Sequence, residues 1–244
     1  MDAVKSLSSM EDGRNNTAML WRAVRDTIPI MFGVVPFGIT CGIMGLTAGL
    51  SSLETVFMSV LVFAGASQFI AIDMLGAGIM GWWVIVLTTL LVNLRHLLMG
   101  ASLAPHVNKL PLPMQGALAF GLVDESYALT ANQIHREGYN AYYQTGVQIS
   151  LYIIWAFSTL AGTVLGEKIS NPLEWGLDFA MPATFLVLLM PRLTDRISLY
   201  VCIISAVFAV LGALYLPGKW YIIIACIAAT IAGGFWERGD QGEE

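Results

Sequence analysis

Val92-Asn93-Leu94-Arg95-His96 interrupts an apolar run that extends over residues 78–104. The side chains of Asn93, Arg95 and His96 can form hydrogen bonds, and the arginine is permanently charged. An arginine at the middle of a bilayer costs at least about 2.5 to 3.5 kcal/mol on insertion scales, so such a residue normally faces protein or water. We therefore expect Arg95 to have an anionic partner inside the protein.

The composition is that of a membrane protein rather than a soluble domain. Of 244 residues, 57% are hydrophobic and 12% are charged, and the mean hydropathy is +0.70. A hydrocarbon layer about 30 Å thick needs roughly 20 apolar residues in a helix. Eight runs approach this length without period-two alternation, which favours helices over strands. The runs are 27–50, 55–75, 78–104, 112–134, 143–166, 175–190, 197–216 and 219–236.

The predicted fold class is therefore all-α, a polytopic helical membrane protein with about eight transmembrane helices. The first run contains two prolines and the sixth has only 16 residues. Either could be re-entrant, which leaves a range of six to eight spans. We expect three segments: a polar N-terminal tail and interfacial lead-in (1–26), a single transmembrane transport domain (27–236) and an acidic C-terminal tail (237–244). Residues 1–26 lack the basic start and short apolar core of a cleaved signal peptide.

The positive charges predict the orientation. If all eight runs span, eight lysines and arginines fall on the side of the termini and four on the opposite side, which favours cytoplasmic termini. The eight are Lys5, Arg14, Arg22, Arg25, Arg136, Arg192, Arg196 and Arg238, and the four are Arg95, Lys109, Lys168 and Lys219.

The first run contains candidate helix breaks at Pro29, Gly33, Pro36 and Gly38. Each proline removes a backbone donor and clashes with the preceding turn. Broken helices in transporters expose backbone groups beside the substrate. The alternative is that glycines at positions 38, 42, 45 and 49 form a flat face for close helix packing.

Asp178 and Pro182 form a further candidate in the sixth run. The carboxylate could cap a helix near a break at the proline, or it could belong to the transport pathway. The sequence leaves both interpretations open.

Two other runs place polar side chains at comparable depth. Ser67 and Gln68 follow three small residues in the second run, and a buried glutamine needs hydrogen-bond partners. They could contact substrate or hold helices together. In the third run, Asn93 and His96 share a helix face. His96 could be a satisfied core histidine or part of a proton relay.

The best partner for Arg95 is Asp124 in the fourth run. It belongs to a stripe of small residues at helical spacing, which indicates contact with another helix. At about 1.5 Å per residue, Arg95 lies about 14 Å and Asp124 about 18 Å from a shared outer end. If the two helices pack antiparallel, we expect an Arg95–Asp124 ion pair, with Glu125 rotated by about 100° onto the adjacent face. The alternative is a static pair that only fixes the bundle.

Several kinds of chemistry have no signature in the sequence. There is no Walker A, H-E-x-x-H or haem-binding cysteine motif, and the Gly65-Ala-Ser67 stretch lacks the second glycine of a nucleophile elbow. The three cysteines lie in apolar runs without motif spacing, so neither a disulfide nor a metal site is expected. No basic stripe points to nucleic acid. We expect no enzyme activity and no cofactor.

Four stretches resemble motifs of the AzlC/YgaZ family, the large subunits of bacterial branched-chain amino acid exporters, and the similarity covers about residues 27–235. The resemblance implies export of valine, leucine, isoleucine or related apolar amino acids across the bacterial inner membrane. It also implies a small AzlD/YgaH-type membrane partner. Met99 stands where the family often has an aromatic residue. The stretches are Ala64-Gly-Ala-Ser-Gln-Phe69, Asn93-Leu-Arg-His-Leu-Leu-Met-Gly100, Phe120-Gly-Leu-Val-Asp-Glu125 and Gly176-Leu-Asp-Phe-Ala-Met-Pro182.

Two functional hypotheses follow. In the first, the protein is a permease or antiporter driven by the proton motive force. Arg95 would hold the substrate carboxylate, Asp124 or Glu125 would bind the ammonium or a proton, and Ser67, Gln68 and Asn93 would orient the amino acid. In the second, it is a non-transporting scaffold or gating subunit for its small partner, and the ion pair is structural. The driving ion is left open.

Overall fold

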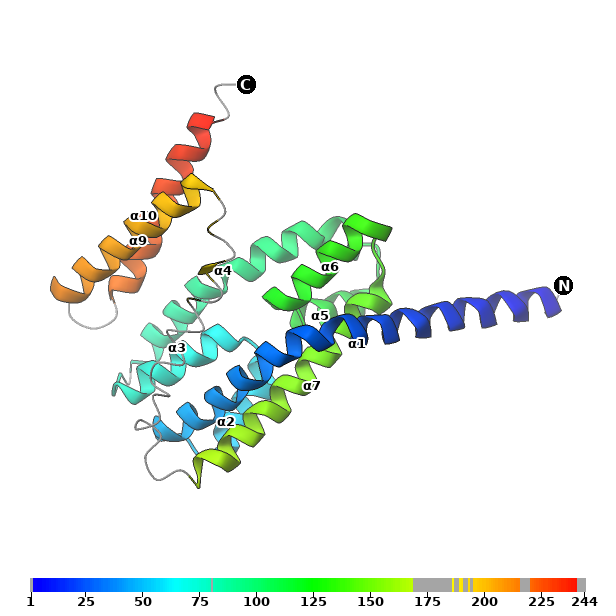
Figure 1. Ribbon diagram of the computed structural model, residues 1–244, viewed down its shortest axis with the longest axis horizontal. Coiled ribbons are helices and arrows are strands. Elements are labelled where there is room, and N and C mark those ends of the chain that lie inside the picture. Colours follow the sequence, from blue (N-terminus) through cyan, green and yellow to red (C-terminus); the bar gives the residue numbers. More distant parts are fainter. Residues whose placement is uncertain are drawn as a thin grey trace.

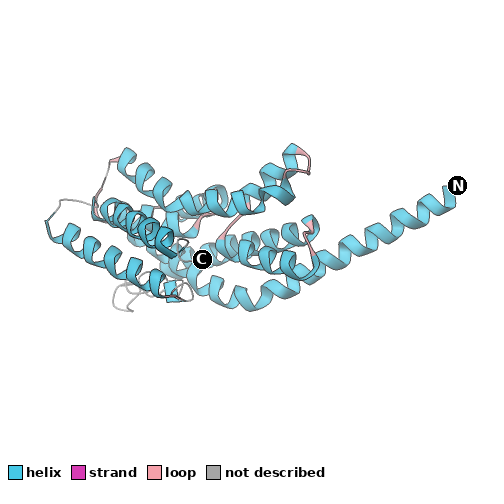
Figure 2. Cartoon of the chain, turned by 90° about the horizontal axis from the view of Figure 1, so that it is seen from above, coloured by secondary structure: helices cyan, strands magenta, loops and turns pink. Residues whose placement is uncertain are grey.

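The computed structural model describes residues 2–79, 81–168, 186, 189–190, 193, 195–215 and 220–240, and the regular elements in these ranges are all helices (Figures 1 and 2). Asp178 and Pro182 lie outside the described residues. The helices are α1 (Asp2–Thr47), α2 (Ser52–Val62), α3 (Gly65–Gly76), α4 (Trp82–Val107), α5 (Leu112–Phe120), α6 (Asp124–Glu137), α7 (Ala141–Gly166), α9 (Arg196–Tyr215) and α10 (Trp220–Asp240).

Within the described ranges, four helices are long and apolar enough to cross a membrane: α1 from Asn16, α4, α7 and α9. The prediction of an all-helical protein is confirmed. The count of six to eight spans and the cytoplasmic termini remain predictions.

α1 and α7 lie side by side and run parallel through the middle of the bundle (Figure 1). α1 is continuous from Asp2 to Thr47, so the predicted break at Pro29, Gly33, Pro36 and Gly38 is wrong. Each proline removes only one backbone hydrogen bond. Contact with α7 along the length of α1 holds the helix together through both positions.

The glycine face of α1 instead provides close packing. A Cβ atom on Gly42 would lie 2.3 Å from Thr159 O, and one on Gly162 of α7 would lie 2.1 Å from Ile39 O. The two backbones thus touch where neither helix has a side chain. The packing alternative is correct for Gly38, Gly42 and Gly45, whereas Gly49 lies in the turn after α1 (φ 91°) and a Cβ atom there would meet nothing within 4 Å.

The second run, expected to be one span, is a helical hairpin. α2 ends at Phe63, which adopts a left-handed conformation (φ 47°, ψ 41°), and α3 starts two residues later. The Gln68 Nε2 donates to Ser59 Oγ across the hairpin (2.8 Å). A Cβ on Gly76 would lie 3.4 Å from Ala48 Cβ, so α3 returns to the end where α2 begins. At roughly 16 Å, α2 is about half as long as a bilayer core is thick.

The fourth run is a second hairpin, formed by α5 and α6. The turn is closed by Ser126, whose Oγ accepts the Val123 N–H (2.9 Å) and donates to Gly121 O (3.1 Å). At the other end of α6, the rings of Tyr139 and His106 stack at 5.4 Å, so α6 ends beside the end of α4. The prediction of a spanning helix over 112–134 is therefore also wrong.

The two hairpins enter the bundle from opposite ends (Figure 1). We call the end with the start of α7 and the last turn of α4 the near end, and the end with Thr47 and Gly166 the far end. The α2–α3 hairpin follows α1 and enters from the far end. The α5–α6 hairpin follows α4, which runs opposite to α1, and enters from the near end. The first six helices are thus two units of one plan in opposite orientation.

α9 and α10 pack against each other as a further pair, and α10 contacts α4. The N-terminal part of α1 projects beyond the bundle at the near end (Figures 1 and 2). Neither feature takes part in the centre formed by α1, α7 and the two hairpins.

Replacing Gly42 by alanine should strongly destabilise the protein, because its Cβ would overlap the α7 backbone. We expect a loss of at least about 1 to 3 kcal/mol, measured as a lower melting temperature in detergent. Gly33→Ala on the same helix is the matched control, since a Cβ atom there would meet no packed neighbour within 4 Å. That change should be neutral or stabilising by up to about 1 kcal/mol. Equal melting temperatures for the two variants would contradict the close packing of α1 and α7.

Candidate functional site

A cavity lies where the tips of the two hairpins meet. Its interior is small: water-sized molecules can be centred in about 50 Å³, and the 550 Å³ of atom-free space around them includes open solvent at the mouth. Both hairpin turns, and the first turns of α3 and α6, contribute to its lining. The lining residues are Val34, Phe37, Phe63, Ala64, Gly65, Ala66, Arg95, His96, Val123, Asp124, Glu125, Leu151 and Trp155.

The cavity contains the ion pair expected from the sequence. Arg95 Nη1 contacts Asp124 Oδ2, and the two side chains are 29% and 15% exposed. The expectation that the two helices pack antiparallel was wrong, however. α6 runs parallel to α4. The hydroxyl groups of Ser102 and Tyr127 pair at 3.0 Å, and each of these residues follows its member of the ion pair along the same helix. Asp124 reaches Arg95 because it is the first residue of a returning half-helix, where a carboxylate is also favoured by the helix dipole.

Arg95 retains unused hydrogen-bonding capacity. Its Nε atom is buried and has no hydrogen-bond partner among the described residues. A buried donor without an acceptor is costly, and native structures usually satisfy such groups. This nitrogen is shielded from solvent, so an acceptor could reach it only if neighbouring groups moved.

The other predicted polar residues divide into two groups. Glu125 and His96 line the cavity beside the ion pair. Ser67 and Asn93 instead bond each other (Ser67 Oγ to Asn93 Oδ1, 2.7 Å) and link α3 to α4. They are not among the lining residues, so the structure offers their side chains no direct contact with a molecule in this cavity.

Gln68 is 1% exposed and is bonded on both sides of its amide. Its Nε2 donates to Ser59 Oγ, and its Oε1 accepts the Trp155 indole N–H at 3.1 Å. This geometry corresponds to the interhelical role considered for Gln68, and it fixes the α2–α3 hairpin against α7.

The sequence did not identify the aromatic residues that join the two hairpin tips. The rings of Phe63 and Phe120 lie 6.2 Å apart, and Tyr152 of α7 contacts both, at 5.1 and 6.0 Å. The Tyr152 hydroxyl also donates to Val60 O at 2.9 Å. Aromatic residues in an apolar run give no local signal of such a role. The acidic pair before Ser126 was an available signal for the break, since acids favour a helix start.

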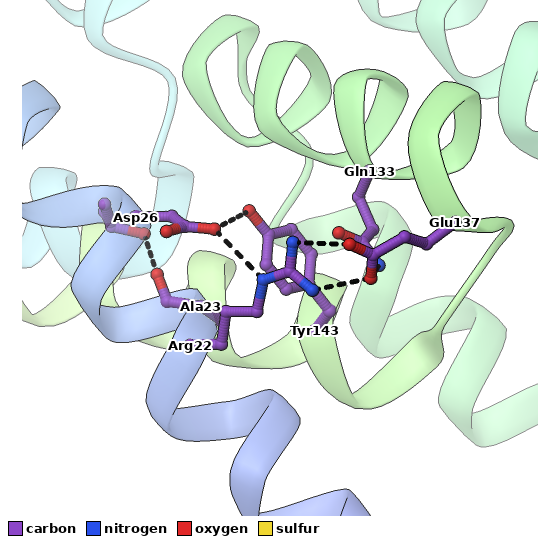
Figure 3. A network of polar contacts seen from close by, with 7 residues as sticks. Arg22, Ala23, Asp26, Gln133, Glu137 and Tyr143 are labelled. Atoms are coloured by element: carbon purple, nitrogen blue, oxygen red, sulfur yellow. Dashed lines mark hydrogen bonds and ion pairs between the residues drawn. The ribbon is translucent and has the colours of Figure 1, made fainter.

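A second polar cluster lies at the near end, outside the cavity (Figure 3). Arg22 of α1 forms a two-pronged bond to Glu137 at the end of α6 (2.5 and 2.8 Å). Tyr143 of α7 donates to Asp26 (3.0 Å), and Gln133 donates to Glu137 (3.3 Å). These contacts tie the base of the α5–α6 hairpin to α1, and α1 to the start of α7.

Comparison with known proteins identifies the family of the chain. The AzlC protein family model matches residues 29–169, more than half of the chain. The chain belongs to the AzlC family. The matched region contains α1 from Pro29, both hairpins, α4 and α7, and therefore every residue that lines the cavity. No solved structure matches the chain.

Relatives of this AzlC protein occur in bacteria and archaea. It is 29% identical to the inner membrane protein YgaZ of Escherichia coli over 232 residues, 91% of this chain and 93% of that protein. It is 29% identical to the branched-chain amino acid transport protein AzlC of Bacillus subtilis over 223 residues, 88% and 85% of the two chains. An uncharacterized membrane protein of Archaeoglobus fulgidus is 30% identical over 184 residues, 75% and 80%.

Breaking the Arg95–Asp124 pair from one side should cost more than removing both charges. A buried charge left without its partner destabilises by about 3 to 5 kcal/mol, and the partial exposure of both groups reduces that figure. We expect Arg95→Met and Asp124→Asn to couple favourably by about 0.5 to 3 kcal/mol in the double variant. The measurement is thermal or denaturant unfolding of all four proteins in one detergent. Additive effects would exclude a direct pair.

The near-end cluster should make a small, pH-dependent contribution to stability. Hydrogen bonds from Arg22 and then Gln133 hold the pKa of the Glu137 carboxyl below its ordinary value. A lowered pKa means that the stabilisation is complete above the ordinary carboxyl pKa and is lost as the pH falls through the folded-state value. Glu137→Gln should therefore melt slightly below the native protein at neutral pH, and the difference should vanish in acid. A difference that persisted after the carboxyl was fully protonated would contradict this origin.

Proposed function

We propose that this protein is a secondary transporter that exports branched-chain and related apolar L-amino acids. The observation that carries the proposal is the cavity between two opposed hairpin tips, with a cation and two carboxylates in its lining. Broken helices whose ends meet near mid-membrane, in units of opposite orientation, are the usual architecture of substrate sites in secondary transporters.

The charges suit a zwitterion. An amino acid carries a carboxylate and an ammonium, and both need partners when water is removed. The guanidinium of Arg95, which lines the cavity, would be the donor for the carboxylate. Asp124 and Glu125, adjacent in the first turn of α6, are acceptors for the ammonium. One of these carboxylates would also carry the proton if transport is driven by the proton motive force.

The hairpins alter how the positive charges are divided between the two sides, and this division predicts the orientation. Because α5 and α6 fold back, Lys109 lies at the near end with Arg136, and not on the opposite side as the eight-span topology required. Among residues 1–168, six lysines and arginines then belong to the near end, one to the far end, and Arg95 to the cavity. This asymmetry favours a cytoplasmic near end and N-terminus. The six are Lys5, Arg14, Arg22, Arg25, Lys109 and Arg136, and the far-end residue is Lys168.

Two further parts of the proposal rest on the family rather than on the geometry. The protein would act in the bacterial inner membrane, and it would work with a small AzlD/YgaH-type membrane subunit. The second candidate function is a scaffold or gating subunit that does not itself transport. Two features favour it, because both stabilise the bundle: the hydrogen bonds of Gln68 and the Arg95–Asp124 ion pair.

Transport of labelled isoleucine or valine by proteoliposomes, with and without the small subunit, separates the two functions. We expect flux that depends on this chain and responds to an imposed proton gradient. Asp124→Asn should reduce the flux at least about 100-fold, the scale of losing a positioned proton-transfer group. Asp195→Asn, at an exposed carboxylate before α9, is the control and should transport normally. Normal flux through a folded Asp124→Asn protein would exclude the coupling role, and flux that needs only the small subunit would favour the scaffold.

A further inference from the structure

The cavity lining is divided by chemistry between two sets of helices. Its charged groups come from α4 and α6, and they are Arg95, His96, Asp124 and Glu125. The large apolar groups come mainly from the central helices α1 and α7. We call Val34, Phe37, Leu151 and Trp155 the apolar wall. An amino acid held by its charged groups at α4 and α6 would direct its side chain toward this wall.

The apolar wall is held rigidly from behind. Trp155 is 5% exposed, and its indole N–H is bonded to Gln68. The Phe37 ring packs edge-on against Trp155, with centroids 5.7 Å apart, and stacks on the buried Phe69 at 4.4 Å. Neither ring can move without disturbing several neighbours, since protein interiors are closely packed.

The hairpin tip that faces the wall is kept small. A Cβ atom on Gly65 would lie 3.1 Å from Trp155 Cη2 and 3.6 Å from the Phe37 ring. Glycine at this position therefore lets the tip pack closely against both rings, with alanines on either side of it in the sequence. The cavity is bounded by the fixed rings of the wall on one side and by this closely packed tip, with Phe63, on the other.

We propose that the apolar wall determines which amino acid side chains the transporter accepts, with Phe37 and Val34 as the residues that set the size limit. This inference rests on the proposed transport function and assigns selectivity within the same site. Phe37 and Val34 are better test positions than Trp155, because Trp155 also supplies a hydrogen bond to the α2–α3 hairpin.

The test compares two leucine substitutions on one helix. Phe37→Leu removes a ring from the wall, whereas Phe32→Leu removes a ring that is 78% exposed on the outside of α1. Proteoliposomes with the full chain and the small membrane subunit are assayed for labelled isoleucine and phenylalanine, and the ratio of the two rates is recorded. The ratio is measured within one preparation, so it does not depend on the fraction of folded protein.

We expect Phe37→Leu to raise the ratio of the phenylalanine rate to the isoleucine rate about tenfold. This is the lower end of the discrimination that a change in the size of an apolar pocket produces. Val34→Ala should shift the ratio in the same direction, and Val34→Leu should lower isoleucine transport relative to alanine. Phe32→Leu should leave the ratios at their native values.

Two failures can be told apart. If the native protein transports none of these amino acids, the proposed function itself is wrong. If the native protein transports isoleucine but Phe37→Leu and Val34→Ala keep its ratios, the apolar wall does not set the selectivity, and this inference is overturned while the function stands.

Discussion

The structure depends on the need to neutralise an arginine inside an apolar bundle. Arg95 lies in the third apolar run, and its partner must be a carboxylate at the same depth. The α5–α6 hairpin meets this need by starting a helix at Asp124 in the interior. The break between α5 and α6 places the Asp124 carboxylate both at the positive end of the α6 dipole and beside the Arg95 guanidinium. A continuous helix through the same residues would give Asp124 only one of these two stabilising contacts.

The two hairpins require a fixed body to enclose them, and α1 with α7 provide it. Their backbones touch at Gly42 and Gly162, so the pair is closer than side chains would allow. α7 then holds the first hairpin through Trp155 and the second through Gln148, which donates to Leu118 O at 2.9 Å. The cavity therefore lies between a rigid pair and two hairpin tips.

The two opposed hairpins are fixed in similar ways. Each tip ends near the middle of the bundle, and each hairpin has its base at one end, where polar contacts fix it. The near-end base is held by Arg22 and Glu137, and the far-end base by a bond from Ser52 to Glu167 (2.5 Å).

The sequence by itself determined the membrane environment, the helical class, the family resemblance and the pairing of Arg95 with Asp124. The family resemblance rests on the four matching stretches, and the others follow from local composition and from the cost of an unpaired charge, which act at every position regardless of topology. Only the tertiary structure decided that 55–75 and 112–134 fold back, that α1 stays continuous through its two prolines, and that Lys109 shares an end with Arg136. An apolar run of about 20 residues can span or return. The choice depends on contacts such as Gln68 with Ser59 and Tyr139 with His106, whose partners are brought together only by the folded bundle.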